Sequence, residues 1–217
     1  MYKLKYIVII LSWSMVSLAH AQQYVDKSKN DEIKSLIGKE KDITGFGNLD
    51  FCVGDVVDQQ ALIIGAYGGI LINKNVMLGV GGYGLATESQ FEGFDPENEE
   101  IRELNLYGGY AGMLIGFKVF SKEIIHLSVP MIVGAGQLDV SDHNYFELPS
   151  GDNDFTLEST SFFVFEPSAL LELNISHHFR LGFGVGYRLI RGSTLENLND
   201  EDLSGYSGVV SIQVGKF

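Results

Sequence analysis

The sequence predicts an all-β fold: an eight-stranded antiparallel up-and-down transmembrane β-barrel with short periplasmic turns and longer outer loops. Residues 44–217 contain eight segments rich in glycine, aromatic and β-branched residues, which is the composition of strands. In the clearest segments apolar residues alternate with polar residues or glycine, as they must when one face of a strand contacts lipid and the other lines a lumen. The links between the segments also alternate in length, which is typical of an up-and-down barrel.

The expected strands cover about 44–56, 61–73, 76–87, 102–119, 124–138, 160–174, 178–191 and 204–217. Three links are tight, at 74–75, 120–123 and 175–177, and three are long, at about 88–101, 139–159 and 192–203. The first link, about 57–60, is short although it falls on the side of the long links. Outer-membrane barrels have short periplasmic turns and long outer loops, and an even number of strands brings both ends of the barrel to the periplasm.

Segment 178–191 shows the alternation most clearly. One face carries a row of aromatic and aliphatic side chains: Phe179, Leu181, Phe183, Val185, Tyr187 and Leu189. The other face carries only arginine and glycine: Arg180, Gly182, Gly184, Gly186 and Arg188. Segment 160–174 repeats the pattern, with Glu166, Ser168, Glu172 and Asn174 on its polar face. We expect the polar faces to line the lumen, because the interior of an eight-stranded barrel is only wide enough for side chains to fill it.

The charges on these two polar faces predict ion pairs inside the barrel. A tight turn joins the two segments, so the register of the hairpin places Glu172 opposite Arg180 and Glu166 near Arg188. A buried ion without a partner is strongly destabilising, so these charges must be compensated. We interpret the four residues as an ion-pair ladder that fills and stiffens the barrel. A path for protons or ions along the ladder is the alternative interpretation.

The first 21 residues have the features of a secretory signal peptide. Lys3 and Lys5 precede an apolar run at 7–18, and Ala19-His20-Ala21 provides a cleavage site before Gln22. The apolar run is shorter than the ~20 residues that a spanning helix needs. Residues 22–43 are polar and rich in lysine, and we expect them to form a periplasmic segment that leads into the barrel at residues 44–217.

The net charge of the whole chain is −13, and loss of the two lysines of the signal peptide makes it −15. This acidity argues against nucleic acid as a partner. Two expected outer loops concentrate acidic residues: Glu88, Glu92, Asp95, Glu97, Glu99 and Glu100 in one, and Asp139, Asp142, Glu147, Asp152, Asp154 and Glu158 in the other. We interpret them as a solvated, repulsive surface. Alternatively, they bind divalent cations and thereby bridge to lipopolysaccharide phosphates.

Several short motifs follow one another through the expected barrel: Gly45-Phe46-Gly47, Gly68-Gly69, Ile72-Asn73, Gly81-Gly82-Tyr83-Gly84, Phe165-Glu166-Pro167, Leu171-Glu172-Leu173-Asn174, Phe179-Arg180-Leu181, Gly186-Tyr187-Arg188 and Gly215-Lys216-Phe217. In this order they resemble an uncharacterised β-barrel family of Bacteroidota outer membranes. The resemblance covers roughly residues 44–217 and implies an eight-stranded barrel in the envelope, without an activity. Phe217 also resembles the terminal aromatic residue with which outer-membrane proteins engage the barrel insertion machinery, although the apolar positions of the last segment are out of phase with it.

One pair of residues raises the possibility of an enzyme. His126-Leu127-Ser128 resembles the His-x-Ser element of outer-membrane lipid A deacylases, in which the histidine activates the serine as a nucleophile. However, His126 follows a short turn, which places it at the periplasmic end, whereas lipid A occupies the outer leaflet. It also falls on the lumen face, where we expect it to pair with Lys118. The sequence predicts no catalytic, cofactor or metal site; Cys52, as the only cysteine, excludes a disulfide within the chain.

The leading hypothesis is therefore a non-enzymatic integral outer-membrane barrel with a structural or surface-interaction role and acidic outer loops. Its expected partners are outer-membrane lipids, lipopolysaccharide and, during biogenesis, the insertion machinery. The second hypothesis is a lipid A-modifying enzyme that uses His126 and Ser128. The third is a soluble, exported, lipocalin-like barrel that holds an apolar ligand. It requires an apolar interior and a polar exterior.

Overall fold

The structure of the chain is a computed structural model that describes residues 42–87, 89–95, 100–141 and 156–217. The predicted signal peptide and the predicted lead-in segment up to residue 41 lie outside these ranges. Within these ranges, no helix is both long and apolar enough to cross a membrane.

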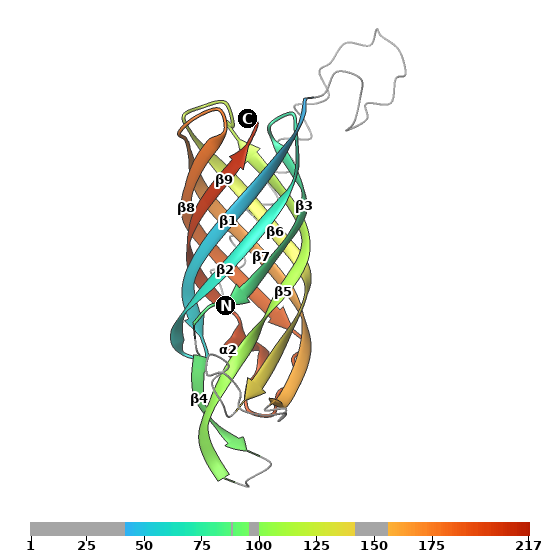
Figure 1. Cartoon of the computed structure of the whole chain (residues 1–217), viewed down its shortest axis with the longest axis vertical. Helices are drawn as coiled ribbons and strands as arrows, with labels where there is room; N and C mark the ends of the chain where they lie inside the picture. Colours follow the sequence, from blue (N-terminus) through green and yellow to red (C-terminus); the bar gives the residue numbers. More distant parts are fainter. Residues whose placement is uncertain (1–41, 88, 96–99, 142–155) are drawn as a thin grey trace, which may run out of the picture. The chain divides into compact units, whose positions relative to one another are not determined.

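The described residues form one β-barrel (Figure 1). Its elements are β1 (Ile43–Val56), β2 (Gln59–Ile72), β3 (Val76–Leu85), β4 (Ser89–Asp95), β5 (Glu100–Val119), β6 (Ile125–Ser141), β7 (Thr156–Asn174), β8 (Phe179–Arg191), α2 (Asp200–Leu203) and β9 (Gly205–Gly215). Every pair of neighbouring strands is antiparallel, β3 pairs with β5, and β1 pairs with β9. Eight strands thus close into a ring, with β4 outside it, which confirms the predicted fold class.

The two ends of the barrel differ as the sequence predicts. The links at 73–75, 120–124 and 175–178 are tight and lie together at the upper end in Figure 1, which we call the turn end. The opposite end, which we call the loop end, holds the two-residue turn between β1 and β2.

Two of the tight turns contain pairs of residues with left-handed backbone angles. Val57 and Asp58 have positive φ angles of 52° and 57°, and Asn73 and Lys74 have φ angles of 52° and 62°. Such left-handed pairs match the right-handed twist of the strands that they join.

The prediction of a loop over 88–101 is wrong for much of that range. Ser89–Asp95 forms β4, which pairs with the first residues of β5 from Ser89 opposite Leu106 to Asp95 opposite Glu100. The resulting hairpin projects beyond the ring at the loop end (Figure 1). Its apolar residues Phe91 and Leu104 are buried, so it adds a small apolar core beyond the ring. Acidic residues dominate the composition of segment 88–101, so the alternation of buried and exposed positions that is typical of a strand is hard to see in its sequence.

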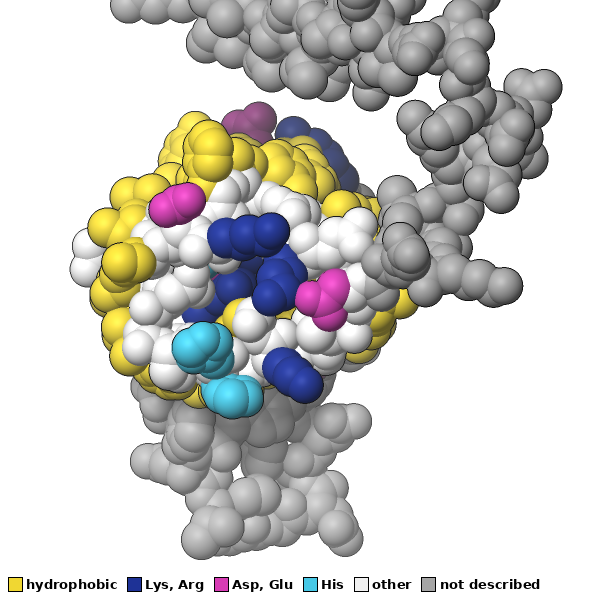
Figure 2. Space-filling model, turned by 90° about the horizontal axis from the view of Figure 1, so that it is seen from above, with side chains coloured by type: hydrophobic (Ala, Val, Ile, Leu, Met, Phe, Trp, Pro, Cys, Tyr) yellow, Lys and Arg dark blue, Asp and Glu magenta, His cyan; other side chains and the backbone are white. Residues whose placement is uncertain are grey.

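Large apolar side chains are exposed on all eight ring strands. This surface, which we call the apolar belt, consists of Leu49, Val53, Ile64, Ile70, Val80, Met113, Ile115, Phe117, Leu127, Val133, Phe163, Phe165, Leu171, Phe183, Val185, Val210 and Val214. Viewed along the barrel, hydrophobic side chains surround a centre of polar and charged ones (Figure 2). The alternation predicted for β7 and β8 is therefore confirmed, with the apolar face outside. Such an exterior contradicts a soluble lipocalin-like barrel, which needs a polar one.

The lumen is divided along its length. At the turn end, charged side chains are buried beside apolar ones such as Leu71, Met77 and Leu170, whereas toward the loop end apolar side chains predominate: Val56, Ile63, Leu106, Leu138, Val140, Phe162 and Ile190. Residues 192–203, which we call the closing segment, add Leu195, Leu198 and Leu203 to this apolar part. The Asn197 side chain binds both the backbone N–H and the carbonyl of Phe94, at 3.0 and 3.1 Å. The closing segment is thereby held against β4.

Glycine makes room for bulky rings in the middle of the lumen. Tyr83 stacks on Tyr110, with ring centroids 5.3 Å apart, and its hydroxyl donates to Asp50 Oδ2 at 2.7 Å. A Cβ atom at Gly65 would lie 2.0 Å from the Tyr83 ring, closer than any real contact. Gly65 is therefore required by the position of Tyr83 and not by its own backbone angles.

Replacing Gly65 by alanine tests this packing. We expect Gly65→Ala to displace the Tyr83 ring and to lower the free energy of unfolding by about 1–3 kcal/mol, the usual cost of overpacking a core. The control is Gly208→Ala, where the new Cβ would have its nearest neighbour at 3.8 Å. That change should alter stability by less than about 0.5 kcal/mol. Urea unfolding of the refolded barrel in detergent measures both, and equal effects would contradict the packing argument.

Candidate functional site

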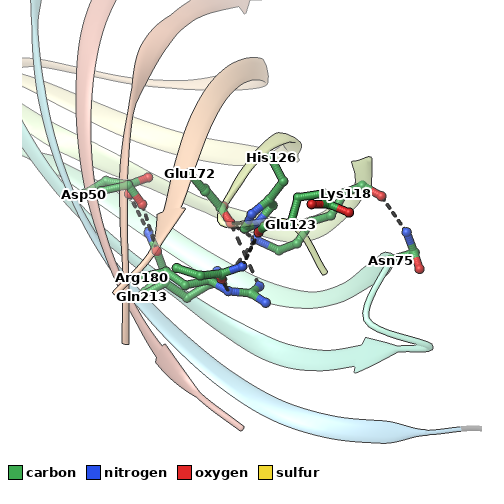
Figure 3. A network of polar contacts seen from close by, with 11 residues as sticks. Asp50, Asn75, Lys118, Glu123, His126, Glu172, Arg180 and Gln213 are labelled. Carbon is green, nitrogen blue, oxygen red and sulfur yellow. Dashed lines mark hydrogen bonds and ion pairs between the residues drawn. The ribbon is translucent and has the colours of Figure 1, made fainter. Parts of the chain in front are cut away.

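Five polar side chains meet inside the turn end of the barrel, and we call them the lumenal cluster. They are Lys118 of β5, His126 of β6, Glu172 of β7, Arg180 of β8 and Gln213 of β9. Antiparallel register brings them to one level, since His126 lies opposite Glu172 and Arg180 lies opposite Gln213. Their strands are consecutive in the ring, and alternation turns each side chain inward (Figure 3).

Glu172 is the centre of the cluster. Its Oε2 atom accepts hydrogen bonds from Lys118 Nζ and from His126 Nε2, the latter at 2.9 Å. Lys118 Nζ also donates to Gln213 Oε1 at 3.1 Å. Arg180 Nη1 lies 4.0 Å from the same carboxylate oxygen. One carboxylate thus compensates two cations and orients an imidazole, while all four side chains are almost completely buried.

The turns support this arrangement from the end of the barrel. The Asn75 side chain donates to the carbonyl oxygen of Lys118 at 2.8 Å, which ties the β2–β3 turn to the end of β5 (Figure 3). The Asn174 side chain donates to the carbonyl oxygen of Glu123 at 2.6 Å and accepts a hydrogen bond from Arg180 Nε at 2.6 Å. Side-chain amides thus tie the β2–β3 link to the end of β5, and the end of β7 to the β5–β6 link.

The structure changes the predicted ion-pair ladder. Glu172 and Arg180 do lie together, but the strongest contacts of Glu172 are with Lys118 and His126. The sequence predicts that Lys118 and His126 pair with each other, whereas in the structure both bind Glu172. Glu166 and Arg188 interact electrostatically, as their predicted proximity implies, but the hydrogen bond that Glu166 accepts comes from the Tyr110 hydroxyl. Arg188 instead donates to two backbone carbonyls, those of Leu203 at 3.0 Å and Asp55 at 3.4 Å.

Two carboxylates in the middle of the lumen are held by neutral groups. Asp50 accepts hydrogen bonds from Tyr83 and from the Asn48 side chain, and Ser211 donates to Asn48 at 2.8 Å. Glu166 is held by Tyr110 across the lumen. Among the described residues, the buried carboxylates are those of Asp50, Glu166 and Glu172, and the buried lysine and arginine side chains are those of Lys118, Arg180 and Arg188. The lumen is thus balanced as a whole rather than pair by pair.

The candidate catalytic pair lies in the same cluster. His126 and Ser128 are both buried on the lumen face of β6, near the turn end. The Nε2 atom of His126 is bound to Glu172. Neither residue belongs to the apolar belt, so an acyl chain in the membrane has no direct contact with them. The arrangement allows charge pairing and hydrogen bonding, and nothing in its geometry presents a nucleophile to a lipid.

Metal ligands are not gathered in the part of the chain that the structure describes: no group of three or more His, Cys, Asp or Glu side chains there could hold an ion. Cys52 is a free, buried cysteine of β1. Glu92 is exposed on β4. Most of the acidic loop predicted at 139–159 lies outside the described residues, and the predicted cation binding there stays a prediction.

Phe217 does not continue the apolar belt, since its ring packs on the guanidinium of Arg180 at 3.7 Å.

These features define a small eight-stranded β-barrel with an apolar exterior and a filled, polar-cored lumen. No protein-family model matches the chain, and no curated protein sequence does. Among solved structures, the crystal structure of Neisserial surface protein A is similar in fold, with a TM-score of 0.51 and 10% identity over 82% of this chain and 100% of that one. Ail, the attachment invasion locus protein of Yersinia pestis, matches with a TM-score of 0.34 and 13% identity over 81% of this chain and 98% of that one.

Removing one member of the central pair should be costly. We expect Glu172→Gln or Lys118→Met to lower the free energy of unfolding by about 3–5 kcal/mol, since each leaves a buried charge without its partner. The double variant Lys118→Met/Glu172→Gln should lose clearly less than the sum of the two single losses.

A double-mutant cycle measured by urea unfolding tests the coupling, and the exposed Lys216→Met variant serves as the control for loss of a lysine. Additive losses would show that the two charges do not depend on each other.

Proposed function

We propose that the chain is a non-enzymatic integral protein of the bacterial outer membrane, with a structural or surface-interaction role. The apolar belt is the observation that carries this proposal. Water solvates such a surface poorly, and a closed ring of strands leaves no backbone group unpaired toward lipid. The fold shared with Neisserial surface protein A supports the same location, and the resemblance to Bacteroidota outer-membrane barrels agrees with it.

The filling of the lumen supports a role other than a general pore. The turn-end half is occupied by the lumenal cluster, and the loop-end half by apolar side chains and the closing segment. An eight-stranded barrel is already narrow, and these side chains occupy the path that a solute would need. We therefore place the function on the surfaces of the barrel, with the loop end outside the cell and the turn end in the periplasm.

The proposed partners follow from these surfaces. Membrane lipids contact the apolar belt, and lipopolysaccharide headgroups lie beside the acidic loop end, where divalent cations bridge carboxylates and phosphates. The barrel insertion machinery is the partner during biogenesis. The lipid A deacylase hypothesis loses support because His126 and Ser128 are both buried on the lumen face and neither belongs to the apolar belt that would contact lipid.

Membrane insertion is tested by the behaviour of the full chain in cells. The protein should sediment with the outer-membrane fraction and migrate differently on gels with and without heating, because a folded barrel resists detergent. A control variant with Phe165→Asp and Phe183→Asp in the apolar belt should be depleted from that fraction, since charges facing lipid are destabilising. Recovery of the parent protein in the soluble periplasm would refute the proposal.

The absence of catalysis is tested at Ser128. We expect Ser128→Ala to leave the lipid A mass spectrum of the producing cells identical to that of cells with the parent chain. Cells without the protein provide the baseline, and fractionation shows that the variant is still inserted. A lipid A species that depends on the protein and disappears with the Ser128 hydroxyl would support the enzyme hypothesis instead.

A further inference from the structure

The turn end of the barrel is hollowed into a funnel of about 530 Å³ that opens to solvent. Basic side chains from three parts of the chain line it: Lys74 of the β2–β3 link, Lys122 of the β5–β6 link, and His177 and Arg180 around the start of β8. Asn174 and Phe217 complete the wall at its narrow part. Figure 2 shows lysine and arginine side chains gathered around the central hollow of this end, with histidines near its rim.

Arg180 forms the floor of the funnel and is held in place from three sides. Its Nε atom donates to Asn174 at 2.6 Å, its guanidinium packs on the Phe217 ring at 3.7 Å, and its Nη1 atom is 4.0 Å from Glu172. Nη1 is buried and makes no hydrogen bond with the described residues. Since Nη1 is sealed from solvent beside Glu172, Arg180 offers the funnel an oriented positive charge rather than this donor, and such a charge attracts a carboxylate or phosphate.

The charges around the floor favour an anion. No aspartate or glutamate side chain lines the funnel among the described residues. Lys74 has an acidic neighbour, Asp42, at 3.9 Å, which is partly exposed and leaves most of the positive charge uncompensated. Below the floor, Glu172 is engaged by Lys118 and His126, so it only partly compensates Arg180. An oxyanion at the floor would offset the excess positive charge.

We propose that the turn-end funnel is a binding site for the oxyanion group, phosphate or carboxylate, of a small molecule, with Arg180 as its main contact. Lys122 and Lys74 attract the anion at the rim, and the Asn174 side chain holds Arg180 in orientation. The funnel lies at the end of the barrel and not on the apolar belt, which favours a soluble ligand over the headgroup of a membrane lipid. That this ligand is periplasmic rests on the proposed location and orientation, whereas the binding itself does not.

The test is a titration of the full chain, folded in an uncharged detergent, with inorganic phosphate at a constant ionic strength near 0.15 M. At that ionic strength charges farther apart than roughly 8 Å are largely screened, so that only local contacts count. We expect saturable binding by calorimetry or NMR, and acetate should compete with phosphate. A second titration uses short-chain phosphatidylglycerol below its critical micelle concentration, to test whether the headgroup of a lipid binds instead. Tighter binding of this lipid than of phosphate would overturn the assignment to a soluble ligand.

Four variants make the result specific to the funnel. Arg180→Gln should weaken phosphate binding at least tenfold, and Arg180→Lys should recover part of it, because the charge returns without the planar fork. Lys122→Gln, at an exposed position, should weaken binding about threefold without a folding penalty. Arg191→Gln, at the loop end of β8, is the matched control and should bind as the parent does.

The heat-dependent gel shift is recorded for every variant, which separates loss of binding from loss of the barrel. If Arg180→Gln does not fold, Lys122→Gln and Lys74→Gln carry the test, and their double variant should bind more weakly than either. Absence of saturable phosphate and acetate binding to the parent would overturn the proposal. Binding that is equally strong in the funnel variants and in Arg191→Gln would also overturn it. Neither result would affect the membrane proposal, which fractionation decides.

Discussion

The pairing of β1 with β9 is the contact on which the other features of this barrel depend. It runs from Phe46 opposite Gly215 to Gly54 opposite Ser207 and joins strands that are about 160 residues apart along the chain. With this pairing every ring strand has two neighbours, and no sheet edge is left among them. Closure also separates the two faces of each strand, so that one row of side chains turns outward while the other is confined to a lumen of fixed width.

That confinement explains the contents of the lumen. Space is limited, so glycine faces the Cβ atom of Tyr67 and the ring of Tyr83, where a further Cβ atom would collide. Charged side chains are also confined, and the lumenal carboxylates are held by hydrogen bonds instead of forming isolated ion pairs. Glu172 serves several partners, while Asp50 and Glu166 are held by phenols and amides. Arg180 lies where the lumen widens into the funnel, held by Asn174 and Phe217.

The division of the lumen along the barrel axis has a physical consequence. At the loop end, the β4–β5 hairpin and the closing segment extend an apolar core beyond the ring, so this end is sealed by packing. At the turn end the links are too short to cover the opening, and polar side chains meet solvent there. The two ends thus offer different chemistry: an acidic, closed surface on one side and a basic, open funnel on the other.

The sequence by itself determined the strand alternation, the tight turns, the number of ring strands and the inward direction of Glu166, Glu172, Arg180 and Arg188, because a period of two and turn composition are local properties. It could not determine which inward charges meet. Glu172 and Lys118 are joined across an intervening strand, and Arg188 reaches carbonyls contributed by β1 and α2. Such contacts depend on ring closure, strand stagger and side-chain length together. Only the tertiary structure decided them, and with them the funnel around Arg180.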